Sequence, residues 1–112
     1  MDLYGLKNCD SCKKALKALE AAGQEVRFVD VRADGVPGEL LAEWLTKHGE
    51  ALINTRSTTW RGMDDDTRAR AGTDPVGLLA EHPTLMKRPV IVARGESHVG
   101  WTKDVQAALL AS

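Results

Sequence analysis

A chain of 112 residues is long enough for one domain with a hydrophobic core, and its 43% hydrophobic and 28% charged residues are typical of globular proteins. A formal net charge of −1 argues against a nucleic-acid-binding surface, and no run approaches the ~20 apolar residues of a membrane span. With two cysteines and no recognisable targeting segment, we expect a cytoplasmic protein without direct nucleic-acid or membrane partners.

The first elements along the chain are a short strand over residues 2–4 and a helix over residues 11–22. The helix is indicated by apolar residues on one face and by Gly23, which is placed to end it. Between the two elements lies a Cys-x-x-Cys pair, Cys9 and Cys12. The helical spacing places Cys12 on the buried face, four residues before Leu16.

Cys9 falls at or just before the first turn of this helix, where backbone N–H groups lack partners and the helix dipole is positive. Both effects favour a thiolate over a thiol, and Lys7, Lys13 and Lys14 add positive charge nearby. We therefore predict that Cys9 is a nucleophile and that Cys12 is its resolving thiol.

Three other interpretations of the pair stay open: half of a zinc site, a structural disulfide, and two inert core cysteines. The histidines that would complete a zinc site, His48, His82 and His98, are scattered singly, so no metal is predicted. A structural disulfide is disfavoured because so short a loop gives little stabilisation and the chain is not a cysteine-rich secreted one. Two inert core cysteines stay an alternative because free cysteine is often simply buried.

A second strand is predicted over residues 26–31, which are rich in β-branched and aromatic side chains. Strand, helix and strand within about 30 residues form a βαβ unit, whose two strands run parallel. A Cys-x-x-Cys in the first turn of such a unit is typical of a thioredoxin-like fold.

The middle of the chain is predicted to be helical after a loop over residues 32–38. One helix spans residues 39–48 and ends at Gly49, a second starts near Asp64, and a third starts at Asp74 with proline in its first position. Pro83 closes the third helix.

Residues 89–93 form the strongest strand of the chain, and Arg94-Gly95 predicts a two-residue turn back through residues 97–99. Thr102 is placed to cap a final helix. The order β-α-β, helices, β-β-α predicts an α/β protein, a single domain over residues 1–112. We expect a thioredoxin-like, mixed four-stranded sheet with an all-helical insertion over residues 36–87.

Three stretches carry a resemblance to a known family: residues 4–10 (YGLKNCD), 52–61 (LINTRSTTWR) and 82–92 (HPTLMKRPVIV). With them the chain resembles the glutaredoxin-type arsenate reductase (ArsC) family, closest to its short branch that includes YffB and Spx. The resemblance implies a nucleophilic cysteine at Cys9 and an anion site built from three arginines. Arg56 and Arg88 match the first two arginines. The third place reads Trp101, with Lys103 nearby.

In thioredoxin-like proteins the proline before the third strand is often cis and lies against the cysteine turn, so we expect a cis peptide bond at Pro89, with Arg88 beside Cys9. The predicted site comprises Cys9 and Cys12 as catalytic thiols, with Arg56, Arg88, Pro89, Lys7 and Asn8 binding the substrate or its anionic group.

The function implied is that of an arsenate-reductase-related thiol–disulfide oxidoreductase without a bound cofactor, with glutathione or another thiol as reductant. Its substrate would be a small-molecule or protein disulfide, or an oxyanion such as arsenate. The alternative is an Spx-like redox-sensing regulator that binds RNA polymerase. The sequence ends at Ser112 without the charged tail typical of that branch, which favours the enzyme.

Overall fold

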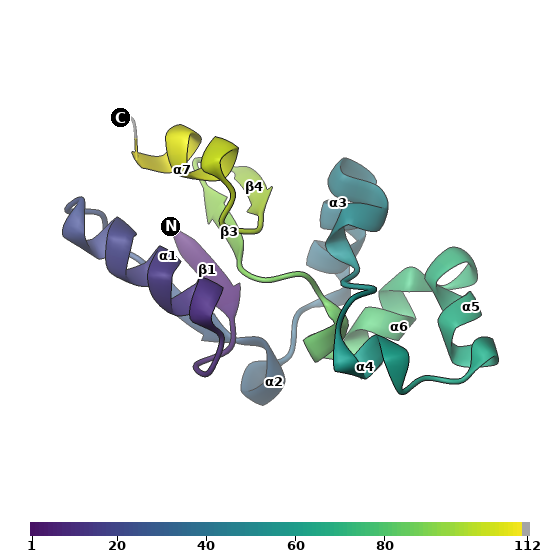
Figure 1. Ribbon diagram of the computed structural model, residues 1–112. Helices are drawn as coiled ribbons and strands as arrows, with labels where there is room; N and C mark the ends of the chain where they lie inside the picture. The colour runs from purple at the N-terminus through teal and green to yellow at the C-terminus, as the bar shows by residue number, and fades with distance from the viewer. Residues whose placement is uncertain (111–112) are drawn as a thin grey trace. The chain divides into compact units, whose positions relative to one another are not determined.

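Four strands form one mixed sheet in the order β2-β1-β3-β4 in the computed structural model, which describes residues 1–110 (Figure 1). They are β1 (Asp2–Gly5), β2 (Arg27–Asp30), β3 (Val90–Ala93) and β4 (Glu96–Val99). β1 pairs in parallel with β2 and antiparallel with β3, and β3 pairs antiparallel with β4. The predicted mixed, thioredoxin-like sheet is therefore confirmed, including the parallel pair.

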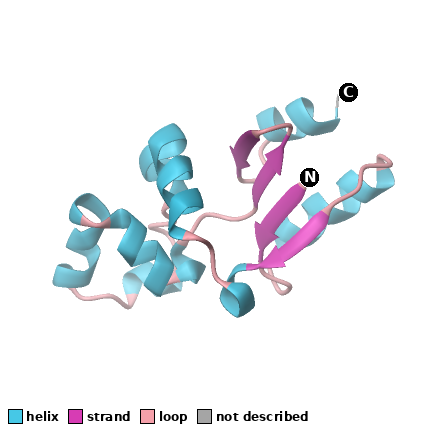
Figure 2. Cartoon of the chain, turned by 180° about the vertical axis from the view of Figure 1, so that it is seen from behind, coloured by secondary structure: helices cyan, strands magenta, loops and turns pink. Residues whose placement is uncertain are grey.

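Two helices cover one face of this sheet, α1 (Asp10–Ala21) and α7 (Lys103–Leu110) (Figure 2). Leu3 of β1 and Ile91 of β3 are direct partners in the sheet and are fully buried. The helices bury apolar residues against them, and the resulting core comprises Leu3, Cys12, Ala15, Leu19, Ile91 and Leu109. Burying a leucine or isoleucine side chain stabilises the fold by about 1.5–3 kcal/mol, so this face holds the sheet and both helices together.

The turn and cap predicted near the C-terminus are both present. Arg94 and Gly95 have φ angles of 53° and 79°, and two consecutive positive φ angles suit a tight hairpin between β3 and β4. Thr102 begins α7 by accepting a hydrogen bond at Oγ1 from the Val105 N–H at 3.3 Å.

Residues Gly35–Lys87 form a second compact unit, distinct from the sheet unit of Met1–Asp34 and the segment that starts at Arg88. It contains α3 (Gly38–His48), α4 (Thr58–Arg61), α5 (Asp65–Thr73) and α6 (Pro75–Glu81), with 3-10 turns over Gly49–Leu52 and Pro83–Leu85. Its buried core comprises Leu41, Trp44, Leu52, Ile53, Leu78, Leu79, Leu85 and Met86.

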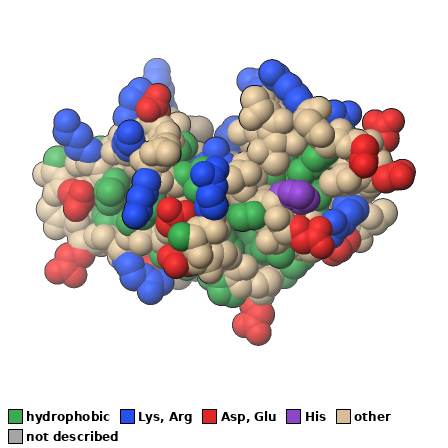
Figure 3. Space-filling model, turned by 90° about the horizontal axis from the view of Figure 1, so that it is seen from below, with side chains coloured by type: hydrophobic (Ala, Val, Ile, Leu, Met, Phe, Trp, Pro, Cys, Tyr) green, Lys and Arg blue, Asp and Glu red, His purple; other side chains and the backbone are tan. Residues whose placement is uncertain are grey.

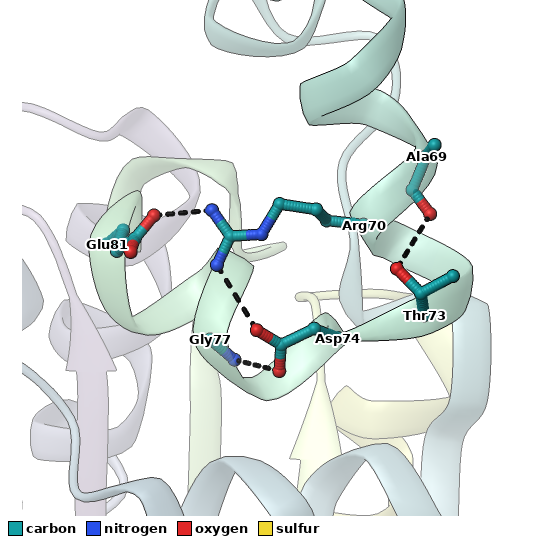
Figure 4. A network of polar contacts seen from close by, with 6 residues as sticks. All are labelled: Ala69, Arg70, Thr73, Asp74, Gly77 and Glu81. Atoms are coloured by element: carbon teal, nitrogen blue, oxygen red, sulfur yellow. Dashed lines mark hydrogen bonds and ion pairs between the residues drawn. The ribbon is translucent and has the colours of Figure 1, made fainter.

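Aspartates cap two helices of this unit: the cap predicted at Asp74 is confirmed, and the helix start predicted near Asp64 has Asp64 itself as its cap. Asp64 accepts a hydrogen bond from the Thr67 N–H at 2.7 Å, and Asp74 accepts one from the Gly77 N–H at 3.1 Å. The second Asp74 oxygen receives the Arg70 guanidinium at 3.2 Å, and Arg70 also pairs with Glu81 (Figure 4). Arg70 thus joins the last turn of α5 to both ends of α6.

One predicted loop is wrong in part. The second strand ends at Asp30, and Val31–Asp34 forms a short helix, α2, where a loop was expected from Arg32. Asp30 Oδ1 accepts hydrogen bonds from the N–H groups of Arg32 and Ala33, at 2.9 and 3.1 Å. The Asp30 side chain thus accepts the N–H groups of the first turn of α2, as an N-cap does. These bonds favour a helix over a continued strand after Asp30.

One face of the molecule shows how the charged side chains are distributed. On the face drawn in Figure 3, basic and acidic side chains are interspersed and hydrophobic ones form only small patches. Among residues 1–110, no large hydrophobic side chain is exposed, and no helix has the length and apolar character of a membrane span.

Candidate active site

Cys9 is the residue that precedes the first turn of α1, where the central strand β1 passes into the helix. Its φ and ψ of −94° and 120° are extended, and its carbonyl accepts the Lys13 N–H at 3.0 Å, so Cys9 is the N-cap of α1. The turn is closed by a bond from the Cys9 N–H to the Leu6 carbonyl at 3.2 Å. The side chain is half-buried, which leaves the thiol accessible.

Cys12 lies one turn further and is 1% exposed, on the core side of α1. Gly5 at the end of β1 leaves the space that Cys12 occupies. A Cβ added at Gly5 would lie 3.2 Å from the Cys12 Cβ and would overlap its Sγ. A larger residue at the end of β1 would therefore displace the second thiol.

The surroundings of the two thiols move their pKa values in opposite directions. Burial acts to raise the pKa of Cys9, but hydrogen bonds from the backbone and thiol of Cys12 and the hydrogen-bonded guanidinium of Arg88 outweigh it, so its pKa is lowered. Burial raises the pKa of Cys12 to about 12, and the nearby Cys9 thiolate adds to this effect. Of the two thiols, Cys9 is therefore the one that loses its proton more readily.

Arg88 reaches this site from the start of β3. The peptide bond between Arg88 and Pro89 is cis, as predicted, and the Pro89 carbonyl accepts the Gly100 N–H at 2.8 Å. The Arg88 side chain is half-buried and its charge favours the thiolate form of Cys9. A planar, permanently charged guanidinium is suited to bind a second anion as well.

A cavity of about 440 Å³ opens beside Cys9 within the sheet unit. It is lined by Leu6, Lys7, Asn8, Cys9, Asp30, Arg32 and Arg88. The structure thus brings together four of the predicted site residues, Lys7, Asn8, Cys9 and Arg88, around one space.

Asp30 and Arg32 were missed by the sequence analysis. They follow β2, and Asp30 is the register partner of Gly5 in the parallel neighbour β1. Because the carboxyl ends of parallel strands meet at one edge of a sheet, the residues after both strands lie close together. The predicted parallel pair could therefore have indicated that the residues after the second strand lie beside the cysteine turn.

Arg56 lies in the helical unit, in the turn where its N–H donates to Asn54 Oδ1 at 3.1 Å, and its side chain is exposed. Its approach to Cys9 stays a prediction. Trp101, at the place of the family's third arginine, packs against the core of the sheet unit, and Lys103 is exposed at the start of α7.

No cluster of three or more His, Cys, Asp or Glu residues suited to one metal ion occurs in residues 1–110. Of the three histidines weighed for zinc, His98 lies in β4 of the sheet unit, whereas His48 and His82 belong to the helical unit.

Comparison with known proteins identifies the family. The model of the ArsC family matches residues 4–109. An uncharacterized protein of Haemophilus influenzae is 42% identical over 95% of this chain and 96% of its own length. The solved structure of a YffB protein is 34% identical, covers 97% of both chains and has a TM-score of 0.86. The global transcriptional regulator Spx of Bacillus subtilis is 29% identical over 91% of this chain and 80% of its own. The chain therefore belongs to the ArsC family, in the branch that includes YffB and Spx.

Proposed function

We propose that this ArsC-family protein is a thiol–disulfide oxidoreductase in which Cys9 is the nucleophile and Cys12 the resolving thiol. The observation that supports it is the environment of Cys9, whose pKa is lowered by hydrogen bonds from Cys12 and by Arg88. A thiolate beside an accessible cavity is the reactive form of cysteine, and a purely structural thiol does not need it.

In the first step the Cys9 thiolate attacks one sulfur of a substrate disulfide. The substrate S–S bond breaks, a mixed disulfide forms at Cys9, and the other substrate sulfur leaves as a thiolate that takes up a proton from solvent. The basic side chains that line the cavity, Lys7 and Arg88 among them, stabilise an anionic group on the substrate. Asn8 supplies polar contacts at the same wall. We assign Arg56 a second anion contact on the basis of the family resemblance.

In the second step Cys12 attacks the Cys9 sulfur. Part of what raises the pKa of Cys12 is the neighbouring Cys9 thiolate, and that charge disappears once Cys9 is in a mixed disulfide. The Cys12 proton passes to the departing substrate thiolate, which leaves as a thiol, and a Cys9–Cys12 disulfide remains. The protein has then lost two electrons and the substrate has gained them.

An external thiol such as glutathione must return the Cys9–Cys12 disulfide to the dithiol. No other cofactor enters this scheme. We expect the cycle to operate in a reducing compartment such as the cytoplasm, where a thiol pool drives it forward.

Arsenate is expected to be a poorer substrate than a disulfide. Arsenate must be held before the thiolate attacks arsenic, and with Trp101 at the third arginine's place one contact to the oxyanion is lost. Such a contact to a charged group is worth about 1.5–3 kcal/mol, which corresponds to roughly tenfold to more than hundredfold in turnover.

The test is to assay reduction of a small disulfide and of arsenate side by side with glutathione as reductant. We expect disulfide reduction to exceed arsenate reduction, Cys9→Ser to abolish both, and Cys12→Ser to accumulate the mixed disulfide. Trp101→Arg should increase arsenate turnover relative to the parent. Absence of any thiol-exchange activity in the parent protein would overturn the proposal.

A second candidate function rests on the similarity to Spx, which covers most of both chains. In that case the Cys9–Cys12 pair would act as a redox switch on binding to RNA polymerase, without turnover. A binding assay with purified RNA polymerase, with the pair reduced and oxidised, separates the two functions. Redox-dependent binding by a protein that does not turn over disulfides would favour the regulator.

A further inference from the structure

We propose that the backbone N–H of Leu6 is a further catalytic group, which stabilises the negative charge on the Cys12 sulfur as Cys12 attacks the mixed disulfide at Cys9. The proposal rests on the proposed thiol–disulfide exchange and assigns a group to its second step. That step forms the Cys9–Cys12 bond, breaks the bond from Cys9 to the substrate sulfur, and leaves the proton of Cys12 on the departing substrate thiol.

The second step needs such a group because Cys12 lies where a thiolate is costly. Its side chain is 1% exposed, and burial raises its pKa to about 12. The core cluster that holds Cys12 contains no ionisable side chain apart from the two cysteines. The cluster therefore offers no carboxylate or imidazole that could take the Cys12 proton as a general base. Stabilisation of the thiolate has to come from a hydrogen-bond donor or from a charge outside the cluster.

The end of β1 supplies a donor. Against the effect of burial, a hydrogen bond from the Leu6 N–H lowers the pKa of Cys12, and it does so more than the charge of Arg88. Gly5 makes this approach possible, because a Cβ added at Gly5 would overlap the Cys12 Sγ. A glycine at the end of a strand lets another group come close to the backbone. The packing around Gly5 and the hydrogen bond thus place the Cys12 sulfur at the same point of the chain.

The Leu6 contact gains importance once Cys9 has reacted. In the free protein the Cys12 thiol is hydrogen-bonded to Cys9 and lies beside its charge, and after burial both effects raise the pKa of Cys12. Conversion of Cys9 to a mixed disulfide removes that charge, which leaves burial opposed by the Leu6 N–H and by Arg88. Arg88 acts on Cys12 through its charge and is hydrogen-bonded to Cys9. The Leu6 N–H is the group that donates directly to the Cys12 sulfur.

The experiment removes the Leu6 N–H without changing any side chain. A synthetic peptide of residues 1–8, with an ester in place of the Gly5–Leu6 amide, is joined by native chemical ligation to the segment that begins at Cys9. The full chain is then folded. The ester keeps the Leu6 carbonyl, which accepts the Cys9 N–H at 3.2 Å. The matched control is the same ligated chain with an amide at this position, and Leu6→Pro removes the same N–H in a genetically encoded protein.

The two steps are followed separately in a single turnover. Equimolar protein is mixed with the disulfide of thionitrobenzoate, each half of which becomes coloured when it leaves. Attack by Cys9 releases the first half, and attack by Cys12 releases the second. Cys12→Ser should lack the second phase, which assigns that phase to Cys12.

We expect the first phase to be nearly the same in the ester and amide chains and the second phase to be slower in the ester chain. For each pH unit by which the pKa of Cys12 rises, its thiolate becomes about tenfold scarcer but roughly threefold more nucleophilic, so the rate falls about threefold. The midpoint of the pH profile of the second phase should move upward in the ester chain, and Leu6→Pro should move it in the same direction.

The outcomes separate this inference from the proposed function. A second phase with the same rate and pH profile in the ester and amide chains would overturn the assignment of Leu6 and leave Cys12 as the resolving thiol. Equal slowing of both phases, with a lower melting temperature, would make the Leu6 N–H a structural group and would overturn the assignment as well. A parent protein that shows the first phase alone would contradict the role of Cys12, and one that shows neither phase would contradict the proposed function itself.

Discussion

The contribution of Arg88 to the thiolate of Cys9 is the most direct test of the site. Replacing it in Arg88→Gln keeps a hydrogen-bond donor of similar shape but removes the positive charge. A hydrogen bond to a charged group is worth about 1.5–3 kcal/mol, and one pH unit of pKa corresponds to ~1.36 kcal/mol. Cys9 and Arg88 are only half-buried, and the hydrogen bonds from Cys12 remain in the variant. We therefore use the low end of this energy range for the loss of Arg88.

We therefore expect the pKa of Cys9 to rise by about one pH unit in Arg88→Gln, with roughly tenfold less thiolate at pH values below the parent's pKa. The assay is the rate of alkylation by iodoacetamide against pH, with the Cys9 adduct identified by mass spectrometry of its peptide. In the variant the midpoint should move to higher pH. Cys12 does not interfere, because its pKa is raised to about 12.

Lys17→Gln is the matched control, since it removes a charge from the same helix away from the cavity. Its midpoint should equal that of the parent. The reasoning is refuted if Arg88→Gln retains the parent midpoint while its circular dichroism and melting curve show that it is folded.

Three further outcomes are expected from packing, capping and pH. Gly5→Ala should destabilise the fold by about 1–3 kcal/mol in denaturant melts, because the added Cβ overlaps Cys12, whereas Gly72→Ala, in a helix with open space around it, should be neutral or stabilising. Equal effects of the two would contradict this packing. Asp74→Ala should cost about 1–2 kcal/mol through the lost α6 cap, with Asp74→Asn milder, and a melt unchanged by Asp74→Ala would argue against the cap. Because the folded pKa of Cys12 is raised from 9.0 to about 12, its stabilising effect is complete below pH 9.0 and declines as pH rises toward 12. Stability measured across that window should therefore fall more steeply in the parent than in Cys12→Ser, and parallel curves would count against the buried thiol.

The sequence predicted the elements whose signals are local. The spacing from Cys9 to Leu19 was enough to place one thiol at a helix start and the other in the core, and the aspartate caps of α5 and α6 follow from short motifs. The short helix α2 was missed because four residues are too few for a helical periodicity to be visible.

The site was predictable only in part, since its walls come from segments that are distant in the sequence. Cys9, Lys7 and Asn8 are contiguous, and Arg88 was found through its match to the family motif. Asp30 and Arg32 carry no motif, and they join the site only through the parallel register of β1 and β2. Side-chain convergence of this kind follows from strand pairing, so the predicted parallel pair pointed to this loop but no motif marked the two residues themselves.

The pairing of β1 with β3 has a consequence for the chain during its synthesis. Asp2 pairs with Val92, so the central pair of the sheet joins residues from opposite ends of the sequence. Inserting a long loop between them adds little closure entropy, because each doubling of loop length costs only about 0.6 kcal/mol. The burial of Cys12 is nevertheless delayed during synthesis. Cys12 packs in a core that includes Ile91 and Leu109, and these residues leave the ribosome long after it. In the nascent chain Cys12 therefore stays open to solvent and to chance oxidation until Ile91 and Leu109 have emerged.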